Sequence, residues 1–339
     1  MVPDRYSIVI DAMGGDHAPH EIIKGAEQAD RFKDTHIILA GSTAKIKKAA
    51  SELNISLANM GIIEADQEIP MDRSPAEVLK YGRQSSIFRG TEEASKLPKG
   101  AFLSAGNTGA VMACSLFNMK RIQGVARPAI CVVVPIGIKK LVLLDVGANV
   151  DSKPRYLEQF AVMGKVYSQN ILGVKDPKIG LINVGSEEKK GNELTVEAHK
   201  LLKKADINFT GNVEGRDLFE GAVDIAVCDG FIGNILLKSI EGLAGLLFGE
   251  VKNVLTKNTV NKLLALGLKS SLKEMKKKFD YEEYGGAYLL GINGITIISH
   301  GSSRAKAIYN AARVAREGLE SDLIGKIKQE LKVNDDREV

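Results

Sequence analysis

Short runs of Val, Ile and Leu alternate with longer amphipathic segments along most of the chain. The runs predict nine strands, at residues 8–11, 36–40, 101–105, 129–135, 140–146, 178–184, 207–211, 224–229 and 294–299. Helical spacing of apolar positions lies between most of them, for example at residues 19–32, 108–120, 155–169 and 303–320. Apolar strands that alternate with helices are typical of a mostly parallel sheet covered by helices on both faces. Since residues 129–135 and 140–146 are too close for a crossover helix, they predict an antiparallel hairpin and a mixed sheet. The pattern favours one compact α/β unit over residues 1–339.

The ends of these strands share a polar, glycine-rich composition. They read DAMGGD, LAGST, SAGNTG, DVGAN, NVGSEEKKGN, TGNVEG, CDGFIGN and SHGSS. Glycine lets the backbone approach an anion, and the helix that follows presents free N–H groups and the positive end of its dipole. One such corner alone is explained by tight turns and helix caps. Because so many occur, we expect them to meet at one edge of the sheet and to form an anion site.

Several polar residues in these corners are candidates for binding phosphate or another substrate. The corner that opens the chain offers Asp11, Gly14, Gly15 and His17, and the next offers Ser104, Asn107 and Thr108. Asn149 and His300 each follow a later strand, and either histidine could donate a proton. A lone histidine is more often a hydrogen-bonded turn residue. The chain has neither GxxxxGK[ST] nor GxGxxG, which argues against ATP and NAD.

The densest corner is NVGSEEKKGNEL, residues 183–194. Lys190 comes just before Gly191 and Asn192, where a helix begins, and Ser186 lies earlier in the same loop. A lysine at this position can hold an anion because its ammonium group adds to the free amides of the helix. The plainer interpretation is a solvated charged loop. Because the loop comes directly after a buried strand, the anion-binding interpretation is as well supported as the solvated loop.

Residues 228–238 read CDGFIGNILLK and place Asp229 and Asn234 between a strand and a helix. The amide of Asn234 can donate a hydrogen bond to a carbonyl oxygen as that oxygen gains negative charge. The alternative is that these residues only cap the helix. No GxSxG motif is present, which argues against a covalent serine mechanism, and no His, Cys and Asp spacing matches a metal site. We therefore expect neither a metal nor another cofactor.

Composition narrows the class of protein. The chain is 44% hydrophobic and 26% charged, so it can bury a substantial core. The formal charge of +4, the absence of Trp and the 5% aromatic content disfavour a nucleic-acid binder. Three cysteines without metal spacing predict free thiols in a reducing compartment, and the N-terminus does not resemble a signal peptide. These observations predict a soluble intracellular protein.

Residues 250–280 differ from the rest of the chain. They contain eight lysines and three acidic residues, so they carry the positive excess of the whole protein. Apolar residues gather on one helical face or flank it: Leu263, Leu264, Leu266, Leu268 and Leu272. A basic amphipathic segment can lie on an anionic membrane or bind an acidic partner, although packing against the body or a second subunit is the commoner reason for an apolar stripe. We expect residues 250–285 to form a protruding, surface-seeking helical segment.

The motifs DAMGGDHAP, SAGNTGA, LLDVGANVD, GSEEKKGNEL, CDGFIGN and LLGINGITIISHGSS occur in this order, and the chain thereby resembles the phosphate acyltransferase (PlsX) family from about Ile8 to Leu319. The resemblance implies a homodimeric, three-layer α/β/α Rossmann-like protein, similar in fold to the isocitrate and isopropylmalate dehydrogenases and to phosphotransacetylases. It also implies transfer of a fatty acyl group from acyl-acyl carrier protein to inorganic phosphate, at the entry to bacterial phospholipid synthesis. The acyl phosphate would pass to a membrane glycerol-3-phosphate acyltransferase. The hairpin at 250–280 would give a cytoplasmic protein peripheral contact with the membrane.

The resemblance places the catalytic lysine at Lys190 and the catalytic asparagine at Asn234. In this chain Lys189 stands where the family usually has a small residue, so the lysine doublet leaves open which ammonium reaches the substrate. Ile232 and Ser186 stand where Thr is frequent. Three other interpretations remain: an acyltransferase of the same fold that uses acyl-CoA, a non-catalytic protein that binds acyl carrier protein at the membrane, and a dehydrogenase.

Overall fold

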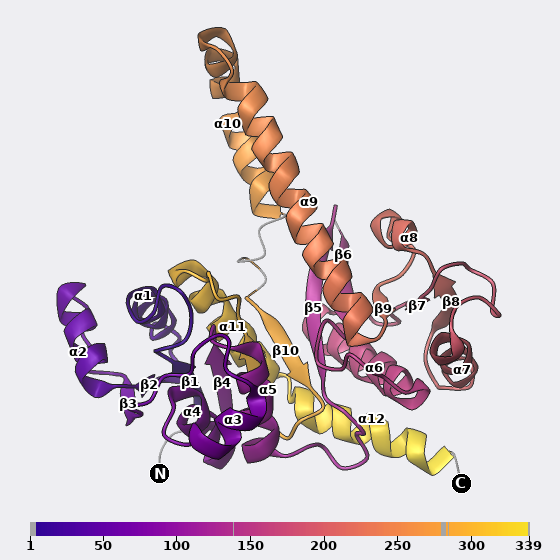
Figure 1. The fold of residues 1–339 in the computed structure, drawn as a ribbon, viewed down its shortest axis with the longest axis horizontal. Helices are drawn as coiled ribbons and strands as arrows, with labels where there is room; N and C mark the ends of the chain where they lie inside the picture. The colour runs from indigo at the N-terminus through magenta and orange to yellow at the C-terminus, as the bar shows by residue number, and fades with distance from the viewer. Residues whose placement is uncertain (1–4, 138, 279–282, 284, 338–339) are drawn as a thin grey trace.

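The structure is a computed structural model that describes residues 5–137, 139–278, 283 and 285–337. Within these residues, 11 strands form one mixed sheet in the order β3-β2-β1-β4-β11-β10-β5-β6-β9-β7-β8 (Figure 1). The strands are β1 (Tyr6–Asp11), β2 (Thr35–Gly41), β3 (Gly61–Glu64), β4 (Gly100–Ser104), β5 (Ala129–Ile136), β6 (Lys139–Leu144), β7 (Ile179–Ile182), β8 (Phe209–Val213), β9 (Ile225–Val227), β10 (Ala287–Leu290) and β11 (Ile295–Ile298).

The sheet contains two parallel blocks. Strands β3, β2, β1, β4 and β11 run in one direction, and β6, β9, β7 and β8 run parallel to one another. Between the blocks, β11 pairs with β10, β10 with β5, and β5 with β6, and all three pairs are antiparallel. Three reversals in a row make the second block antiparallel to the first. The predicted hairpin of β5 and β6 is therefore confirmed, and it is one of the features that divide the sheet.

Helices cover both faces of the sheet, as predicted. One layer contains α1 (His20–Ala29), α2 (Thr43–Glu52), α6 (Pro154–Tyr167) with its π-helical extension η1 (Ser168–Leu172), α7 (Glu193–Leu202), α11 (Ala305–Glu320) and α12 (Leu323–Arg337). The other contains α3 (Pro75–Tyr81), α4 (Ser86–Lys96), α5 (Thr108–Met119), α8 (Gly215–Glu220) and the first turns of α9 (Gly230–Thr256).

Alternation within the strands produces the two cores. Ile8 and Ile10 of β1 are buried in the core beneath α1 and α11, while Val9 is buried in the core on the opposite face. Successive side chains of a strand point to opposite faces, so a strand that is apolar throughout must be covered on both. The α/β/α arrangement thus follows from the continuous apolar runs.

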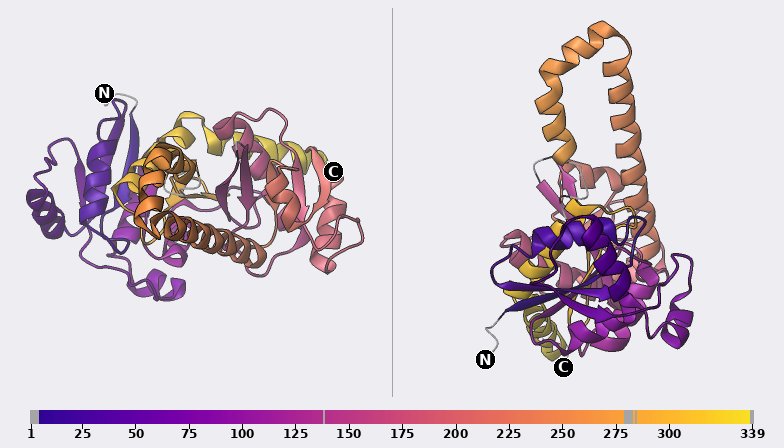
Figure 2. Two further views of the ribbon diagram at one scale, coloured as in Figure 1. Left: turned by 90° about the horizontal axis from the view of Figure 1, so that it is seen from above. Right: turned by 90° about the vertical axis from the view of Figure 1, so that its left-hand side faces the viewer.

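A long helical hairpin projects from this body (Figure 1). It consists of the outer part of α9 together with the whole of α10 (Thr259–Lys278). The right-hand view of Figure 2 shows α10 returning beside α9. The predicted protruding hairpin is confirmed, although its first helix already begins at Gly230. Leu266 and Leu268 are exposed and Leu272 is half-buried. The side chains of Leu263 and Leu264 lie outside the described residues.

Two strands were not predicted. The segment GIIE of β3 is only four residues long, and AYLL of β10 was missed although it pairs with the predicted β11. β3 is a short edge strand with only two strongly apolar residues, so the pattern along the chain marks it weakly. β10 is apolar throughout and lies between β11 and β5, but a run of four residues is too short to be distinguished from a loop by periodicity alone.

Candidate functional site

The loop between β7 and α7 fixes the backbone of Lys190. The Lys190 N–H donates to the Glu187 carbonyl at 3.0 Å, and Asn183 Nδ2 donates to the Lys190 carbonyl at 2.9 Å. The stem of Lys190 lies over Gly185, where a β-carbon would be 3.1 Å from Lys190 Cγ. Its ammonium group is exposed and, among the described residues, has no hydrogen-bond or ion-pair partner. The backbone is thus held while the charge remains available.

A second asparagine holds the same loop from below. Asn212 of β8 donates its Nδ2 to the Glu187 carbonyl at 2.8 Å, the carbonyl that also accepts the Lys190 N–H. Its Oδ1 lies 2.9 Å from Nδ1 of the buried His199 of α7. Since an amide oxygen only accepts, His199 Nδ1 must carry the proton in this pair. The sequence prediction missed Asn183, Asn212 and His199, because their partners are distant in the sequence or are backbone groups.

The other polar residues of this loop have different surroundings. Asn192, predicted to bind substrate, is the N-cap of α7, and its Oδ1 accepts from Thr195 N at 3.0 Å. Ser186 is exposed in the loop. The amino end of α7 therefore lies beside Lys190, with its dipole directed at the same loop.

The corner after β6 is organised by Asp145, which the sequence prediction did not select. Its Oδ1 accepts from the N–H groups of Ile130 at 2.9 Å, Gly147 at 3.2 Å and Ala148 at 3.0 Å. Its Oδ2 accepts from Asn149 N at 2.7 Å and from Asn149 Nδ2 at 2.9 Å. Burial raises the pKa of the Asp145 carboxyl, and hydrogen bonds from Ala148, Ile130 and Asn149 oppose that rise. Asn149, a predicted substrate ligand, is engaged in building this corner.

The amino end of α9 packs against the Asp145 corner. Gly230 N donates to the Asn149 carbonyl at 2.8 Å, and Asp229 caps the helix by accepting from Ile232 N at 2.9 Å. Asn234, on the next turn, lies over Gly147: a β-carbon at Gly147 would be 3.7 Å from Asn234 Oδ1. The Asn234 side chain is exposed and has no hydrogen-bond partner in the described part of the chain.

A separate corner is formed by the carboxyl ends of β1, β4 and β11. Ser104 Oγ donates to Oδ2 of the buried Asp11 at 2.7 Å, and Asp11 Oδ1 accepts from Met13 N at 3.1 Å. Burial raises the pKa of the Asp11 carboxyl, partly offset by hydrogen bonds from Ser86 and Ser104. Gly14 has no room for a side chain, since a β-carbon there would be 2.3 Å from Asp11 Oδ2. These residues support one another, as Asp145 supports its own turn.

The remaining predicted residues also lie at this corner. Asn107 caps α5, and its Nδ2 donates to the carbonyls of Pro70, Met71 and Arg73, so it holds the loop before α3. A β-carbon at Gly15, where φ is +102°, would be 3.0 Å from the Gly301 carbonyl oxygen. Three further predicted residues lie in the same corner: Thr108 is exposed, His17 is half-buried and His300 Nδ1 is 2.8 Å from Ser302 Oγ.

The expectation that all corners share one edge is wrong. Because the two blocks of strands are antiparallel, the corners after β1, β4 and β11 belong to one block and the corners after β6, β9 and β7 to the other. The second block brings Lys190 and Asn234 to the ends of the neighbouring strands β7 and β9. Two helix amino ends lie at this edge, together with an ammonium and an amide that have no partner in the part of the chain that the structure describes. Such groups bind an anion and a developing oxyanion.

Metal chemistry has little support from the side chains. Over the residues that the structure describes, no group of three His, Cys, Asp or Glu side chains could hold a metal ion.

Comparison with solved structures defines the class of fold. The chain is similar to the EutD phosphotransacetylase from Staphylococcus aureus, with a TM-score of 0.64 and 16% identity, covering 93% of this chain and 94% of that one. A phosphotransacetylase from Streptococcus pyogenes matches with a TM-score of 0.64 and 18% identity, covering 94% and 95%. A 4-hydroxythreonine-4-phosphate dehydrogenase from Klebsiella pneumoniae follows at 0.52 and 13%, covering 92% and 98%. The protein thus has the Rossmann-like fold of phosphotransacetylases, as predicted.

Comparison of sequences defines the family. The family model described as "Fatty acid synthesis protein" matches residues 6–326. The phosphate acyltransferase of Desulfitobacterium hafniense is 50% identical over 325 residues, which cover 96% of this chain and 97% of that protein. The phosphate acyltransferase of Halothermothrix orenii is 47% identical over 327 residues, covering 96% and 98%. The chain belongs to the phosphate acyltransferase family, a family of transferases, and the resemblance stated from its motifs is confirmed.

Proposed function

We propose that this protein transfers a fatty acyl group from acyl-acyl carrier protein to inorganic phosphate and so supplies acyl phosphate for phospholipid synthesis. The observation that carries the proposal is that the Lys190 ammonium and the Asn234 amide, neither of which has a partner among the described residues, both lie at the ends of the adjacent strands β7 and β9. The family's name supports the phosphate acceptor. The carrier-protein donor rests on the resemblance of the motifs.

The chemistry needs positioning more than a base, because phosphate is already largely a dianion near neutral pH. Lys190 and the amino end of α7 hold the phosphate, one of whose oxygens attacks the carbonyl carbon of the thioester. Asn234 donates to the oxyanion that forms on the carbonyl oxygen. The tetrahedral intermediate then collapses, the carbon–sulfur bond breaks, and the thiolate leaves and takes a proton from water. The alternative that His17 donates this proton instead stays a prediction, and His17 lies in the separate corner after β1.

The geometry favours Lys190 over Lys189 as the phosphate ligand. Lys190 has its N–H and its carbonyl bound within the loop, and its stem lies over Gly185 at the end of β7. Lys189 is exposed, and no described contact holds its side chain. A held backbone reduces the conformational entropy that a lysine loses when it binds an anion.

The decisive experiment incubates purified protein with long-chain acyl-acyl carrier protein, with and without inorganic phosphate, and traps acyl phosphate as its hydroxamate. We expect phosphate-dependent product from the carrier thioester and little from acyl-CoA. Product from acyl-CoA alone would favour the same-fold acyltransferase, and bound but unreacted thioester would favour a non-catalytic binding protein.

Variants test the assigned roles against matched controls. Lys190→Ala should raise the KM for phosphate, while Lys189→Ala should leave it unchanged. Asn234→Ala should lower kcat by about a hundredfold or more, as loss of one oxyanion donor does elsewhere, while Ser239→Ala on the exposed side of the same helix should not. Wild-type kinetics in both site variants would refute the assignment.

We further propose that the α9–α10 hairpin binds an anionic membrane surface from the cytoplasmic side. α9 is by length and composition apolar enough to cross a membrane, and only 6% of that apolar stretch is buried. Leu246 and Leu266 are exposed by 61% and 65%. Lysines on the hairpin would add attraction to anionic lipid.

Vesicle binding tests this second part. Wild-type protein should sediment with vesicles that contain anionic lipid and be released by alkaline carbonate, which distinguishes a peripheral protein from a spanning one. Leu266→Glu with Leu268→Glu should abolish sedimentation and keep phosphate-dependent turnover in solution. Resistance to carbonate would contradict peripheral attachment.

A homodimer is supported by the apolar face at the base of α9. Phe231, Ile232 and Ile235 are all exposed in the isolated chain, with Phe231 exposed by 54%. Because exposed aromatic and aliphatic clusters mark interfaces, we place a second copy on this face. A monomer by sedimentation equilibrium would refute this part.

The acyl phosphate product would pass to a membrane glycerol-3-phosphate acyltransferase.

A further inference from the structure

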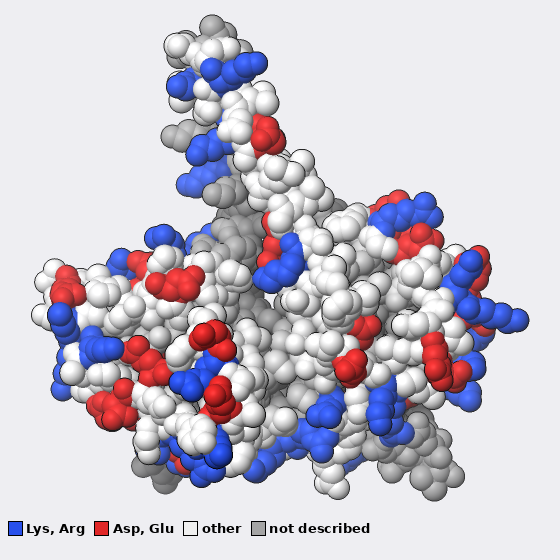
Figure 3. All heavy atoms as spheres, in the orientation of Figure 1, with Lys and Arg blue, Asp and Glu red and all other residues white. Residues whose placement is uncertain are grey.

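The loop between α5 and β5 forms a basic surface that the reaction does not use. We call Lys120, Arg121, Arg127 and the neighbouring Arg83, together with the exposed ring of Phe117, the basic loop surface. Residues of this loop and the end of α5 line a surface cavity of about 430 Å³: Leu116, Lys120, Arg121, Ile122, Gln123, Gly124 and Val125. Figure 3 shows Lys and Arg gathered along the lower middle of the molecule, at the end opposite the hairpin.

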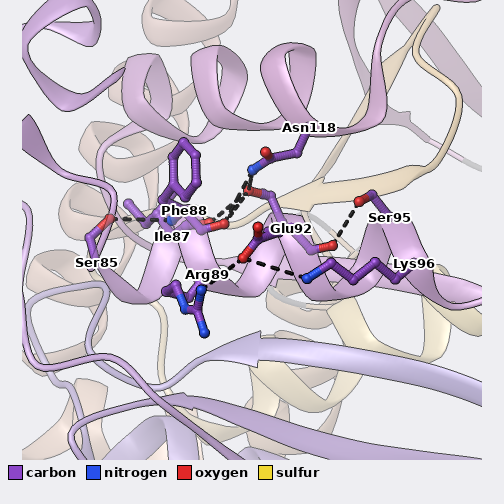
Figure 4. A network of polar contacts seen from close by, with 9 residues as sticks. Ser85, Ile87, Phe88, Arg89, Glu92, Ser95, Lys96 and Asn118 are labelled. Carbon is purple, nitrogen blue, oxygen red and sulfur yellow. Dashed lines mark hydrogen bonds and ion pairs between the residues drawn. The ribbon is translucent and has the colours of Figure 1, made fainter. Parts of the chain in front are cut away.

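Among the described residues, the cations of this surface form no ion pair with a carboxylate, unlike those on the adjacent helix α4. On the adjacent helix α4, Arg89 and Lys96 are both paired with Glu92, at 3.0 Å and 3.7 Å (Figure 4). In contrast, Lys120 Nζ lies 4.8 Å from the centre of the Phe117 ring, and Arg83 Cζ lies 5.7 Å from the same ring. Arg127 is exposed, and none of these cations forms an ion pair within the described residues. The surface therefore carries uncompensated positive charge around an aromatic side chain.

The loop is held in one conformation. The Arg121 guanidinium donates to the carbonyls of Val125 and Ala126, which closes the loop on itself. Gln159 of α6 donates its Nε2 to the Gly124 carbonyl at 2.9 Å and accepts from Ala126 N at 2.8 Å. A surface fixed in this way loses little conformational entropy when a partner binds.

Hydrogen bonds connect the loop to the proposed site. Pro128, at its end, accepts from Asn149 Nδ2 at 2.7 Å, and the Asn149 carbonyl accepts from Gly230 N at 2.8 Å. Gly230 begins α9, the helix that carries Asn234 one turn later. A protein bound on the loop would thus lie next to the corner where its thioester must react.

From this charge, rigidity and position, we propose that the basic loop surface docks an acidic protein, the carrier that brings the acyl thioester. The inference rests on the proposed function. Carrier proteins are acidic as a class, and complementary charge accelerates encounter and fixes orientation. The surface lies at the far end from the hairpin (Figure 1), so a membrane-bound enzyme leaves it open to a soluble partner. This assigns carrier docking to the loop, and the hairpin lysines to lipid.

Steady-state kinetics with two donors tests the proposal. The variant is Lys120→Glu with Arg127→Glu, because Arg121 also closes the loop and is left intact. We expect its KM for acyl-acyl carrier protein to rise about tenfold with kcat unchanged. With an acyl-pantetheine thioester, which has no protein to dock, KM and kcat should match the wild type. Added salt should raise the KM of the wild type for acyl-acyl carrier protein, so that the KM values of the wild type and the variant become similar.

Two charge-matched controls locate the effect. Lys33→Glu with Lys47→Glu, on exposed positions near α1 and on α2, should change neither KM. Lys252→Glu with Lys257→Glu tests the hairpin, and a rise in the carrier KM there instead would overturn the proposal. Three results with the loop variant would also overturn it. They are an unchanged KM for acyl-acyl carrier protein, an equal loss of activity with both donors, and loss of the loop variant's binding to anionic vesicles.

Failure of the proposed function can be distinguished from failure of the docking proposal. If the wild type shows no phosphate-dependent turnover with either donor, the transferase reaction is wrong. Fluorescence anisotropy of labelled acyl carrier protein still measures docking in that case. Equal binding by the wild type and the loop variant would refute the docking surface, and about tenfold weaker binding by the variant would retain it.

Discussion

Gly233 is the point of closest approach between α9 and the end of β6, and replacing it tests how the Asn234 helix is seated. A β-carbon at Gly233 would be 1.8 Å from the Asp145 carbonyl oxygen and 3.0 Å from Cys228 Sγ. Real β-carbons do not approach backbone atoms closer than 3.0 Å, so the helix in Gly233→Ala must move by more than about 1 Å. Both clashing groups are buried, and the oxygen belongs to the backbone, which cannot rotate away.

The expected cost combines two opposing terms. Overpacking of a close contact costs about 1–3 kcal/mol, and we take the upper part of that range because the obstacle is backbone. Replacing Gly by Ala within a helix recovers about 0.5–1 kcal/mol of backbone entropy. The net loss of unfolding free energy should be about 2 kcal/mol. A displacement of about 1 Å at Asn234 should also lower turnover by about a hundredfold.

Gly245→Ala on the same helix is the matched control. Among the described residues, no atom lies within 4 Å of a β-carbon at Gly245, so only the favourable helix term remains and the variant should gain about 0.5–1 kcal/mol. Urea denaturation followed by circular dichroism measures both changes, and the hydroxamate assay measures turnover. If Gly233→Ala and Gly245→Ala shift stability in the same direction by similar amounts, α9 does not lie against Asp145 as described.

Three further outcomes follow from other contacts. Asn212→Ala leaves the Glu187 carbonyl without its side-chain donor, so the KM for phosphate should rise with a smaller change in kcat, and Asn208→Ala nearby should not alter it; equal kinetics would show that Asn212 does not hold the Lys190 loop. Arg316 binds Asp34 through two hydrogen bonds, at 2.8 Å and 2.6 Å, and lowers its pKa; since Asp34 is partly exposed, Arg316→Met should cost at most about 1 kcal/mol. That contribution is complete above the pKa of an unfolded aspartate, about 3.9, and is lost as pH falls toward the lower pKa of the folded state, so a difference that persists unchanged in acid would contradict it. Burial raises the pKa of Cys114 to about 12, and Cys131 and Cys228 are buried too, so a thiol reagent at neutral pH should modify the protein only after unfolding.

The sequence predicted the layers of the fold because the relevant forces are local. A run such as Ile8-Val9-Ile10 must be buried on both faces, and amphipathic helices between such runs must cover them. The predicted β5–β6 hairpin followed from a short connection. What could not be read was the consequence of that hairpin combined with the unpredicted β10. Three antiparallel pairings reverse the second block, and strand order is a property of distant contacts.

The candidate site shows the same division. Lys190 and Asn234 were selected from their place after strands and from the resemblance, and the structure puts both at one edge. Asn107 and Asn149 have the same appearance in the sequence, yet their side chains hold a loop and a turn. Asp145 had a usable signal, because it ends an apolar strand before a glycine turn as Asp11 does. For Asn212 and His199, no local pattern distinguishes them from surface residues.

The length of α9 sets the distance between Asn234, at the base of the helix, and the tip of the hairpin. From Asn234 to Thr256 the helix rises by about 33 Å, whereas one leaflet of a bilayer's hydrocarbon core is about 15 Å thick. If the hairpin meets the lipid by its tip, the proposed reaction at Asn234 would take place outside the hydrocarbon, at a distance set by how deep the tip lies in the leaflet. The acyl phosphate of the proposed reaction would then have to cross that distance before it lies wholly in the leaflet. α9 would thus act as a rigid spacer between Asn234 and the membrane. Removing whole turns from it would shorten the distance that a hydrolysable product has to cross.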